Sequence, residues 1–281
     1  MYKRLNRWFP VFVLPTLVSF CIAFLVPFGM GVWLSFHRFT TVTNARFVGL
    51  ENYLRAFTED DSFLRALGFT AIFTVVSIVV VNVLAFTLAL LLTRGLRGTA
   101  LWRSIFFMPN LIGGIVLGYV FSLLVNGLLG FWGVDITFSA TYGFWGLIAL
   151  NTWQLAGYMM VIYIAGLQNV PTDLTEAAAI DGASAATTLW RVKLPLVMPS
   201  ITICTFLTLT NSCKLFDQNL ALTAGAPDRQ TQMLALDIYQ TFYGRVGWQG
   251  VGQAKAVLFF LLVATIAGLQ LRITRSREVD A

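Results

Sequence analysis

The sequence predicts an all-α fold, that of a polytopic membrane protein with about six transmembrane helices. Of its 281 residues, 57% are hydrophobic and only 11% are charged, and the mean hydropathy is +0.76. This composition lies outside that of ordinary soluble domains. The apolar residues also gather in runs that reach the ~20 residues a helix needs to cross the hydrocarbon core. We place these runs at about 10–36, 67–93, 104–126, 143–168, 196–217 and 255–272.

The first run follows three basic residues, as the apolar core of a signal peptide does. It is too long for such a core and shows no small-residue cleavage site, so we expect it to be retained as the first helix. No change in composition marks a second domain farther along the chain. Residues 1–281 are therefore predicted to form a single transmembrane domain.

Basic residues fall at both ends of the chain and on alternate connections between the runs. Because Lys and Arg in short connections favour the cytoplasmic side, we expect both termini to be cytoplasmic. The opposite connections carry both signs of charge and are predicted to face outward. The residues that set this orientation are Lys3, Arg4, Arg7, Arg94, Arg97, Arg103, Arg191, Lys193, Arg272, Arg275 and Arg277.

The first outward connection contains the stretch LENYLRAF. Leu50, Tyr53, Leu54 and Phe57 recur there at helical spacing, which predicts a short amphipathic helix over about 47–62. In the third run, Gly114 and Gly118 lie four residues apart. Small residues at this spacing allow a neighbouring helix to approach closely.

A water-compatible segment interrupts the apolar sequence at about 172–195, on the predicted cytoplasmic side. It contains EAAAIDGASAATTLWRVKLP, in which alanines favour helix and Gly182 favours a bend. Asp173 to Glu176 has the pattern of a capping box that would start a helix. The segment is predicted to be a helix-turn-helix elbow, which either docks in a partner protein or only connects two spans.

The elbow resembles the EAA loop of bacterial ABC importer permeases, whose pattern is EAA-x3-G-x9-I-x-LP. Glu176-Ala177-Ala178, Gly182 and Leu194-Pro195 match it, and Val192 stands where the pattern has isoleucine. FVGLENYLRAF, NTWQLAGYMMVIYIAGL and KLFDQNLALTAGAP are similar to carbohydrate-type permeases of the maltose and multiple-sugar group. Thr223 to Pro227 reads TAGAP where that group usually has TGGGP.

The resemblance implies the type I ABC importer permease fold, a multi-pass place in a bacterial cytoplasmic membrane and a part in a larger assembly. The expected partners are a second homologous permease subunit, two copies of a cytoplasmic ABC ATPase, an extracytoplasmic solute-binding protein, a carbohydrate substrate and the lipid bilayer. The chain has no phosphate-binding loop, so ATP and Mg²⁺ are expected on the partner ATPase and no cofactor on this chain. By the same resemblance, the ATPase interface is assigned to Glu176, Ala177, Ala178, Asp181 and Gly182.

Polar residues inside the apolar runs are candidates for the substrate path, because polar side chains within a membrane are costly and usually have a reason. Two groups stand at i, i+3 and i+7 along predicted helices, with neighbours that fit sugar hydroxyls and rings. They are Asn211, Lys214 and Gln218 with Asp217, and Asn151, Gln154 and Tyr158 with Trp153. Alternatively, Lys214 and Asp217 form a structural pair and the asparagines join helices; Asn82 and Asn110 are expected to be structural.

Other functions have less support in the sequence. A single histidine and three unpaired cysteines indicate no metal site, disulfide framework or enzyme centre, and no nucleic-acid-binding pattern occurs. An ion-driven secondary transporter would show two repeated halves with broken helices, whereas this chain has one asymmetric elbow. A permease for a non-sugar solute such as glycerol phosphate remains an alternative to a sugar permease.

Overall fold

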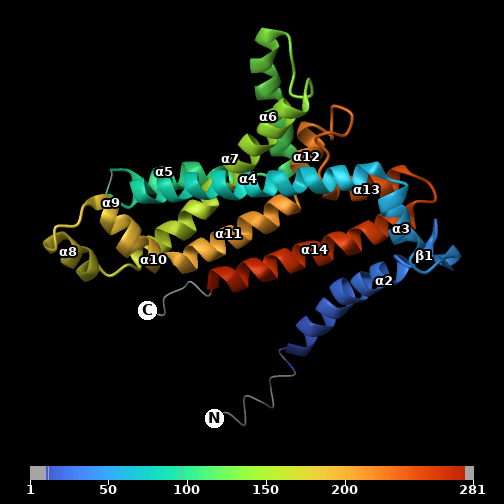
Figure 1. Cartoon of the computed structure of the whole chain (residues 1–281), viewed down its shortest axis with the longest axis horizontal. Coiled ribbons are helices and arrows are strands. Elements are labelled where there is room, and N and C mark those ends of the chain that lie inside the picture. The colour runs from blue at the N-terminus through green and yellow to red at the C-terminus, as the bar shows by residue number, and fades with distance from the viewer. Residues whose placement is uncertain (1–10, 12, 96, 276–281) are drawn as a thin grey trace. The chain divides into compact units, whose positions relative to one another are not determined.

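The computed structural model describes residues 11, 13–95 and 97–275, most of which are helical (Figure 1). Lys3, Arg4, Arg7 and Arg277, on which the predicted orientation partly rests, lie outside these residues. The chain forms two compact units. The first joins Met1–Phe63 to Ile238–Phe260, and the second joins Leu64–Asp237 to Leu261–Ala281. The single domain predicted over 1–281 stays a prediction.

Five helices among the described residues are long and apolar enough to cross a membrane: Val13–Leu34, Asp61–Leu92, Gly114–Trp132, Ala140–Gln168 and Gln249–Thr274. A sixth span results if Ala185–Leu196 and Met198–Cys213, which meet at a bend of 71°, count as one. The predicted all-α membrane fold with about six spans is therefore confirmed.

The helices and strands follow one another along the chain as labelled in Figure 1. They are α2 (Val26–Leu34), β1 (His37–Arg38), β2 (Arg46–Phe47), α3 (Glu51–Thr58), α4 (Asp61–Leu92), α5 (Thr99–Phe107), α6 (Gly114–Leu129), α7 (Ala140–Gln168), α8 (Thr172–Ile180), α9 (Ala185–Thr188), α10 (Leu194–Leu196), α11 (Met198–Cys213), α12 (Asp217–Leu222), α13 (Leu234–Gly244) and α14 (Gln249–Arg275).

The second unit is built around α7, whose inward residues are largely buried. One core cluster joins α7 to α4 and α11 through Val81, Met159, Tyr163 and Cys204. A second cluster joins the other half of α7 to α4, α6 and α12, with Phe73 at its centre. Because α7 is enclosed on several sides, its polar side chains must find partners inside the protein.

The first unit contains a two-stranded antiparallel sheet, in which His37 faces Phe47 and Arg38 faces Arg46. The amide of Asn52, on α3, donates to the carbonyls of Ser35 (2.8 Å) and His37 (2.9 Å). These bonds satisfy two carbonyl groups that the short strands leave without a hydrogen bond, so Asn52 fixes α3 against this part of the chain.

The predicted short helix in the first outward connection is present, but α3 spans Glu51–Thr58 where about 47–62 was expected. Arg46 and Phe47 form β2, and Gly49 adopts a positive φ of 59° before α3 begins at Glu51. Asn52 and Ala56 are the buried positions of α3. Of the predicted apolar face, Leu50, Leu54 and Phe57 are exposed, and Tyr53 is half-buried with its hydroxyl hydrogen-bonded to that of Ser35.

The predicted third run, 104–126, is not one helix. α5 ends at Phe107, a 3₁₀ turn spans Met108–Leu111, and α6 begins at Gly114. Pro109 lacks an N–H for the helix ladder, and Ile112 has an extended backbone. The predicted close approach at Gly114 and Gly118 is confirmed, since a Cβ at either glycine would lie within 3 Å of a side-chain carbon of α12.

The predicted fifth run, 196–217, is also interrupted. The bend at Val197, between Pro195 and Pro199, separates α10 from α11. At the other end, α11 stops at Cys213 and a new helix, α12, starts at Asp217. Asn211 and Gln218 therefore belong to different helices.

Candidate functional site

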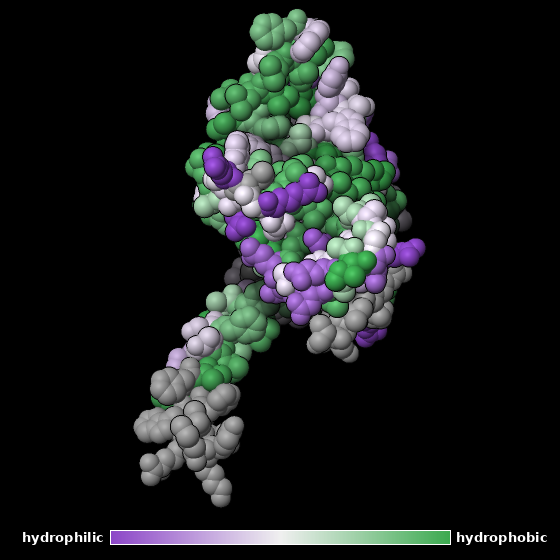
Figure 2. Space-filling view, turned by 90° about the vertical axis from the view of Figure 1, so that its left-hand side faces the viewer, coloured by the Kyte–Doolittle hydropathy of each residue, from purple (hydrophilic) through white to green (hydrophobic). Residues whose placement is uncertain are grey.

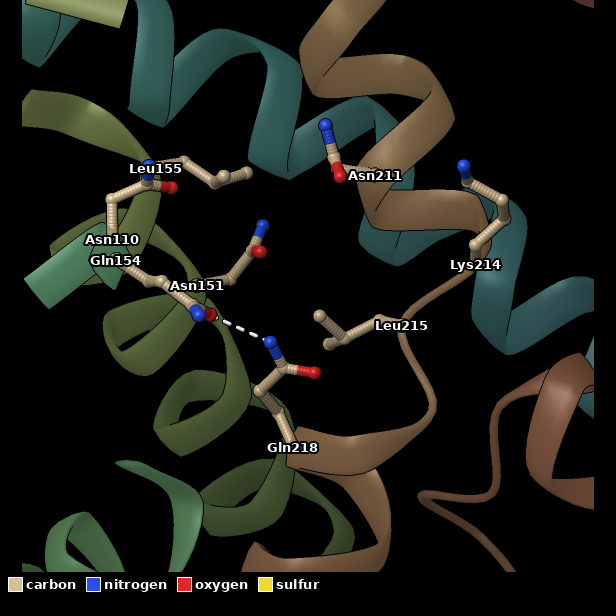
Figure 3. A pocket seen from close by; sticks show the side chains of 8 residues that line it. All are labelled: Asn110, Asn151, Gln154, Leu155, Asn211, Lys214, Leu215 and Gln218. Carbon is tan, nitrogen blue, oxygen red and sulfur yellow. Dashed lines mark hydrogen bonds between the residues drawn. The ribbon is translucent and has the colours of Figure 1, made fainter. Parts of the chain in front are cut away.

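A polar cavity of about 340 Å³ lies inside the second unit (Figure 3). Three helices and one turn supply its wall: α7, the end of α11 with the residues after it, α12 and the 3₁₀ turn before α6. Five of its eight lining side chains are carboxamides. The lining residues are Asn110, Asn151, Gln154, Leu155, Asn211, Lys214, Leu215 and Gln218.

Helix geometry explains the contribution of α7. Asn151, Gln154 and Leu155 are spaced i, i+3 and i+4 and so share one face. On the opposite wall, Asn211 lies on α11, Lys214 directly follows the end of α11, and Gln218 lies on α12. The sequence thus identified three residues that do line one cavity, although the continuous helical face used to group them does not exist.

A hydrogen bond between two glutamines bounds one side of the cavity. Nε2 of Gln218 donates to Oε1 of Gln154 over 2.6 Å, as Figure 3 shows. Nε2 of Gln154 donates in turn to the carbonyl of Ile112 over 3.4 Å. The bond therefore links α12 to α7 and to the break in front of α6.

Asn151 presents an acceptor without a partner. Its amide nitrogen donates to the hydroxyls of Ser77 and Ser212, each at 3.2 Å. Its Oδ1 is buried and makes no hydrogen bond with any described residue. A buried acceptor left in this state is unfavourable, so the site favours a ligand or water that brings a donor.

Lys214 is the one charged side chain in the wall, and no carboxylate lines the cavity. Lys214 and Asp217 form no ion pair within the described chain, so the structural pair considered as an alternative is not present. Asp217 instead lies against Gly114 of α6. In the same described part, no three histidine, cysteine, aspartate or glutamate side chains gather as a metal site.

Two other residues predicted for the substrate path lie away from the cavity. Trp153, on α7, is half-exposed and contacts the ring of Phe121, with 6.0 Å between centroids. Tyr158 packs edge-on against Phe107 at 6.4 Å. The spacing argument placed Tyr158 on the face of Asn151, but the cavity does not extend along the full face of α7.

Asn82 and Asn110 were both expected to be structural, but the structure shows this role only for Asn82. Asn82 donates to Thr208 (3.2 Å) and accepts from the hydroxyl of Tyr163 (2.7 Å), which confirms its role in joining α4, α7 and α11. Asn110 lines the cavity. Its position after Pro109, where an apolar run is broken, is the sequence signal that could have indicated this.

The second candidate site is the elbow, formed by α8, the turn at Gly182 and α9. α8 begins at Thr172, directly after Pro171, and no side chain caps it. The predicted capping box from Asp173 to Glu176 is therefore wrong, because the N-cap is Pro171, two residues before Asp173. Asp173 lies in the first turn, where its charge still favours the helix N-terminus.

Gly182 ends α8 in a Schellman motif. Its N–H donates to the carbonyl of Ala179 (3.1 Å), and the N–H of Ala183 donates to that of Ala178 (2.9 Å). Gly182 has a φ of 75°, a conformation that favours glycine. A Cβ there would meet only open space, so within this chain the turn alone requires the glycine.

The elbow presents most of the predicted interface residues to the outside. Glu176, Ala177, Asp181 and Gly182 are exposed and Ala178 is half-buried. Two large apolar side chains next to them are also uncovered: Ile180 is 86% exposed and Trp190 is 67% exposed. Figure 2, which faces this end of the chain, shows hydrophilic residues gathered around these helices.

Comparison with known proteins gives consistent findings. Residues 99–278 match the family described as binding-protein-dependent transport system inner membrane component. A probable starch degradation products transport system permease protein of Thermoanaerobacterium thermosulfurigenes is 42% identical over 97% of this chain and 96% of its own. A multiple sugar-binding transport system permease protein of Streptococcus mutans is 31% identical over 99% of both chains.

Among solved structures, a chain of a bacterial ABC transporter involved in the import of the acidic polysaccharide alginate superposes with a TM-score of 0.80. The two chains share 18% sequence identity, and the superposition covers 98% of each. At this identity the similarity establishes the fold, and it leaves the substrate open.

Proposed function

Because the chain belongs to the family of inner membrane components of binding-protein-dependent transport systems, we propose that it forms one half of a translocation pathway for sugars. It is a multi-pass membrane protein and a permease subunit of the sugar-importing ABC type. A second permease subunit completes the pathway, and a solute-binding protein delivers the substrate to it.

The carboxamide-lined cavity is the observation that carries this proposal. Asn and Gln side chains offer both donors and acceptors, which suits hydroxyl groups that also do both. The carboxamides that line the cavity can exchange hydrogen bonds with such hydroxyls, and Lys214 can donate to another. The cavity therefore fits a polyhydroxylated solute whose hydrogen bonds replace those lost with water.

The same lining weighs against a phosphorylated solute such as glycerol phosphate. A phosphate dianion is bound by several cationic or N–H donors. Here a single lysine faces a wall that includes a buried, unpaired oxygen, and this oxygen would repel an anion. The chemistry of the cavity favours a neutral sugar, most simply an oligosaccharide segment.

Energy for transport comes from ATP hydrolysed on a partner, and the elbow is the element that receives it. Each of two copies of a cytoplasmic ATPase binds the elbow of one permease subunit. On this chain the contact is formed by Glu176, Ala177, Ala178, Asp181 and Gly182. Ile180 extends that surface, since an apolar side chain this exposed beside a docking helix gains from burial. The elbow, and with it both termini, lies on the cytoplasmic side.

The cavity is tested by transport of a neutral maltooligosaccharide in the assembled transporter. Gln218→Leu removes the amide that bonds to Gln154, and uptake is expected to fall at least ten-fold while the ATPase still co-purifies. Gln230→Leu is the matched control, because Gln230 is exposed in the loop before α13. Wild-type uptake by Gln218→Leu would contradict the assignment of the cavity.

The elbow is tested separately by sugar-stimulated ATP hydrolysis. Gly182→Trp is expected to abolish the stimulation or release the ATPase, because it disrupts the Schellman turn and adds bulk at the contact. Gly182→Asn is the matched control, since asparagine tolerates positive φ and should retain most of the coupling. If Gly182→Trp binds the ATPase and is stimulated like wild type, the elbow is only a connector.

A further inference from the structure

The segment from Ser62 to Val134 contains four arginines and no acidic residue. Three of these arginines lie close together along the chain, at the junction of α4 and α5. Arg94 follows the end of α4, Arg97 lies in the turn, and Arg103 is on the second turn of α5. In Figure 1 this junction lies at the end of the second unit that carries α9.

Among the described residues, none of the three arginines has an ion-pair partner. The four ion pairs found there involve other residues, and no carboxylate of a described residue lies within 4.0 Å of these guanidinium groups. Arg94 and Arg97 are exposed, whereas Arg103 is half-buried. The Nε of Arg103 is fully enclosed and has no hydrogen-bond acceptor among the described residues.

An enclosed guanidinium nitrogen without an acceptor is unfavourable, and most such groups in folded proteins are satisfied. The enclosed Nε is out of reach of a ligand, but the terminal nitrogens of Arg103 are not enclosed and make no hydrogen bond with a described residue, so they can bind an anion. A phosphate suits these nitrogens, because its oxygens accept several N–H groups of a planar guanidinium at once.

The surroundings of Arg103 indicate where that phosphate comes from. Its neighbours on α5 are apolar and uncovered: Leu101 is 64% exposed, Trp102 is 47% exposed and Ile105 is 42% exposed. Trp side chains are enriched at the membrane–water interface, and arginines near a helix end extend toward the headgroups. A free anion gains nothing from these apolar residues, whereas acyl chains pack against them.

We propose that Arg94, Arg97 and Arg103 bind the phosphate of an anionic phospholipid headgroup, with the acyl chains lying against Leu101, Trp102 and Ile105. Arg103 holds the phosphate through the terminal nitrogens of its guanidinium, which are not enclosed, and the two exposed arginines contribute attraction to the anionic leaflet. The site is independent of the sugar cavity, and it requires only that this end of α5 faces the cytoplasmic leaflet.

The test uses the purified full-length chain in detergent micelles doped with dioleoyl-phosphatidylglycerol or with dioleoyl-phosphatidylcholine. Native mass spectrometry counts the retained lipids, and thermal unfolding reports their stabilising effect. Wild type is expected to retain phosphatidylglycerol in preference to phosphatidylcholine. Arg103→Gln is expected to lower that retention about five-fold, the factor associated with one basic residue at an anionic surface.

Two further variants complete the design. Arg94→Gln with Arg97→Gln alters only exposed side chains, so it tests the site even if Arg103→Gln fails to fold, and it too should lower retention. Arg46→Gln is the matched control, because it removes one exposed arginine from β2, on a connection predicted to face outward, and should behave as wild type. Equal retention by wild type and by both cluster variants would overturn the proposal.

Inorganic phosphate distinguishes the two sources of the anion. If the site is a lipid site, phosphate at saturating concentration raises the unfolding temperature less than phosphatidylglycerol does. An equal rise, abolished by the same variants, would assign the site to a free anion and overturn the lipid assignment.

Discussion

At Gly157 of α7, the absence of a side chain allows two helices to touch. A Cβ built there would collide with the backbone of α5 at Phe106 and Phe107. Gly157→Ala must therefore push α5 away from α7. Overpacking of this kind costs about 1–3 kcal/mol, so we expect a clear fall in the unfolding temperature of the purified chain.

Gly127 provides the matched control for that prediction. It lies in α6, where a Cβ would meet nothing within 4 Å, and the same replacement lowers the conformational entropy of the unfolded chain. Gly127→Ala should leave the unfolding temperature unchanged or raise it slightly. Equal stability of the two variants would show that α5 moves freely relative to α7.

Asp60 accepts hydrogen bonds from Lys255 (2.8 Å), Arg245 (3.0 Å) and Ser62 (2.6 Å) in the first unit. Burial raises the pKa of Asp60, but the hydrogen bonds from Lys255 and Ser62 and the charges of Lys255 and Arg245 together hold it below its usual value. The folded state thus favours the ionised carboxylate more than the unfolded chain does.

This direction of shift determines the pH dependence of stability. A depressed folded pKa gives stability that is present above the unfolded pKa, about 3.9, and is lost as pH falls through the folded value. The difference in unfolding temperature between wild type and Asp60→Asn should therefore be constant from neutral pH to about pH 5 and shrink below about pH 4. A difference that does not shrink on acidification would contradict the role of the charge.

At the scale of the elements, long uninterrupted helices were the most predictable. The run placed at 143–168 corresponds to α7, Ala140–Gln168, because nothing in it interferes with helix hydrogen bonding. Average hydropathy does not register Pro109 or the residues from Lys214 to Phe216, so the breaks beside α6 and α11 were missed. The break before α6 places Asn110 in the cavity wall, which is why the sequence did not assign that residue to the cavity.

α3 shows a second limit of pattern reasoning. Its apolar spacing predicted an amphipathic helix, but Leu50, Leu54 and Phe57 are exposed and Asn52 is the residue that faces the protein. Hydrogen bonds to two main-chain carbonyls decide the orientation, and a hydrophobicity pattern contains no information about them. In a membrane protein, apolar side chains can face lipid, so apolar periodicity does not by itself identify the buried face.

The pairing of α6 with α12 supports a prediction at this scale. Gly118 faces Ala221 and the backbone of Gln218, so a large side chain at Gly118 must displace α12. Gly118→Leu should move the amide of Gln218 away from Gln154 and reduce sugar uptake at least ten-fold with normal insertion in the membrane. Ile115→Leu, an exposed position on the same helix, should transport as wild type. Uptake that survives Gly118→Leu would mean that α12 does not position the cavity.

At the scale of the whole molecule, the family and the fold could be recognised from the sequence because the EAA pattern combines several residues at fixed spacing. Whether each end of the chain lies on the cytoplasmic or the outer side of the membrane was predicted only from the distribution of basic residues. Part of that charge belongs to residues outside the described chain, so orientation must be measured directly.

Cysteine labelling in intact cells tests the orientation, in a chain whose native Cys21, Cys204 and Cys213 are replaced. Ile180 on α8, Arg272 on α14 and Leu54 on α3 are all exposed, so a cysteine at each is accessible to reagent. A membrane-impermeant maleimide should modify Leu54→Cys from outside. It should reach Arg272→Cys only after permeabilisation, and Ile180→Cys likewise unless the ATPase covers it. Labelling of Arg272→Cys in intact cells would reverse the topology and place the elbow out of reach of any cytoplasmic ATPase. The coupling mechanism therefore depends on this outcome, even though the fold and the cavity do not.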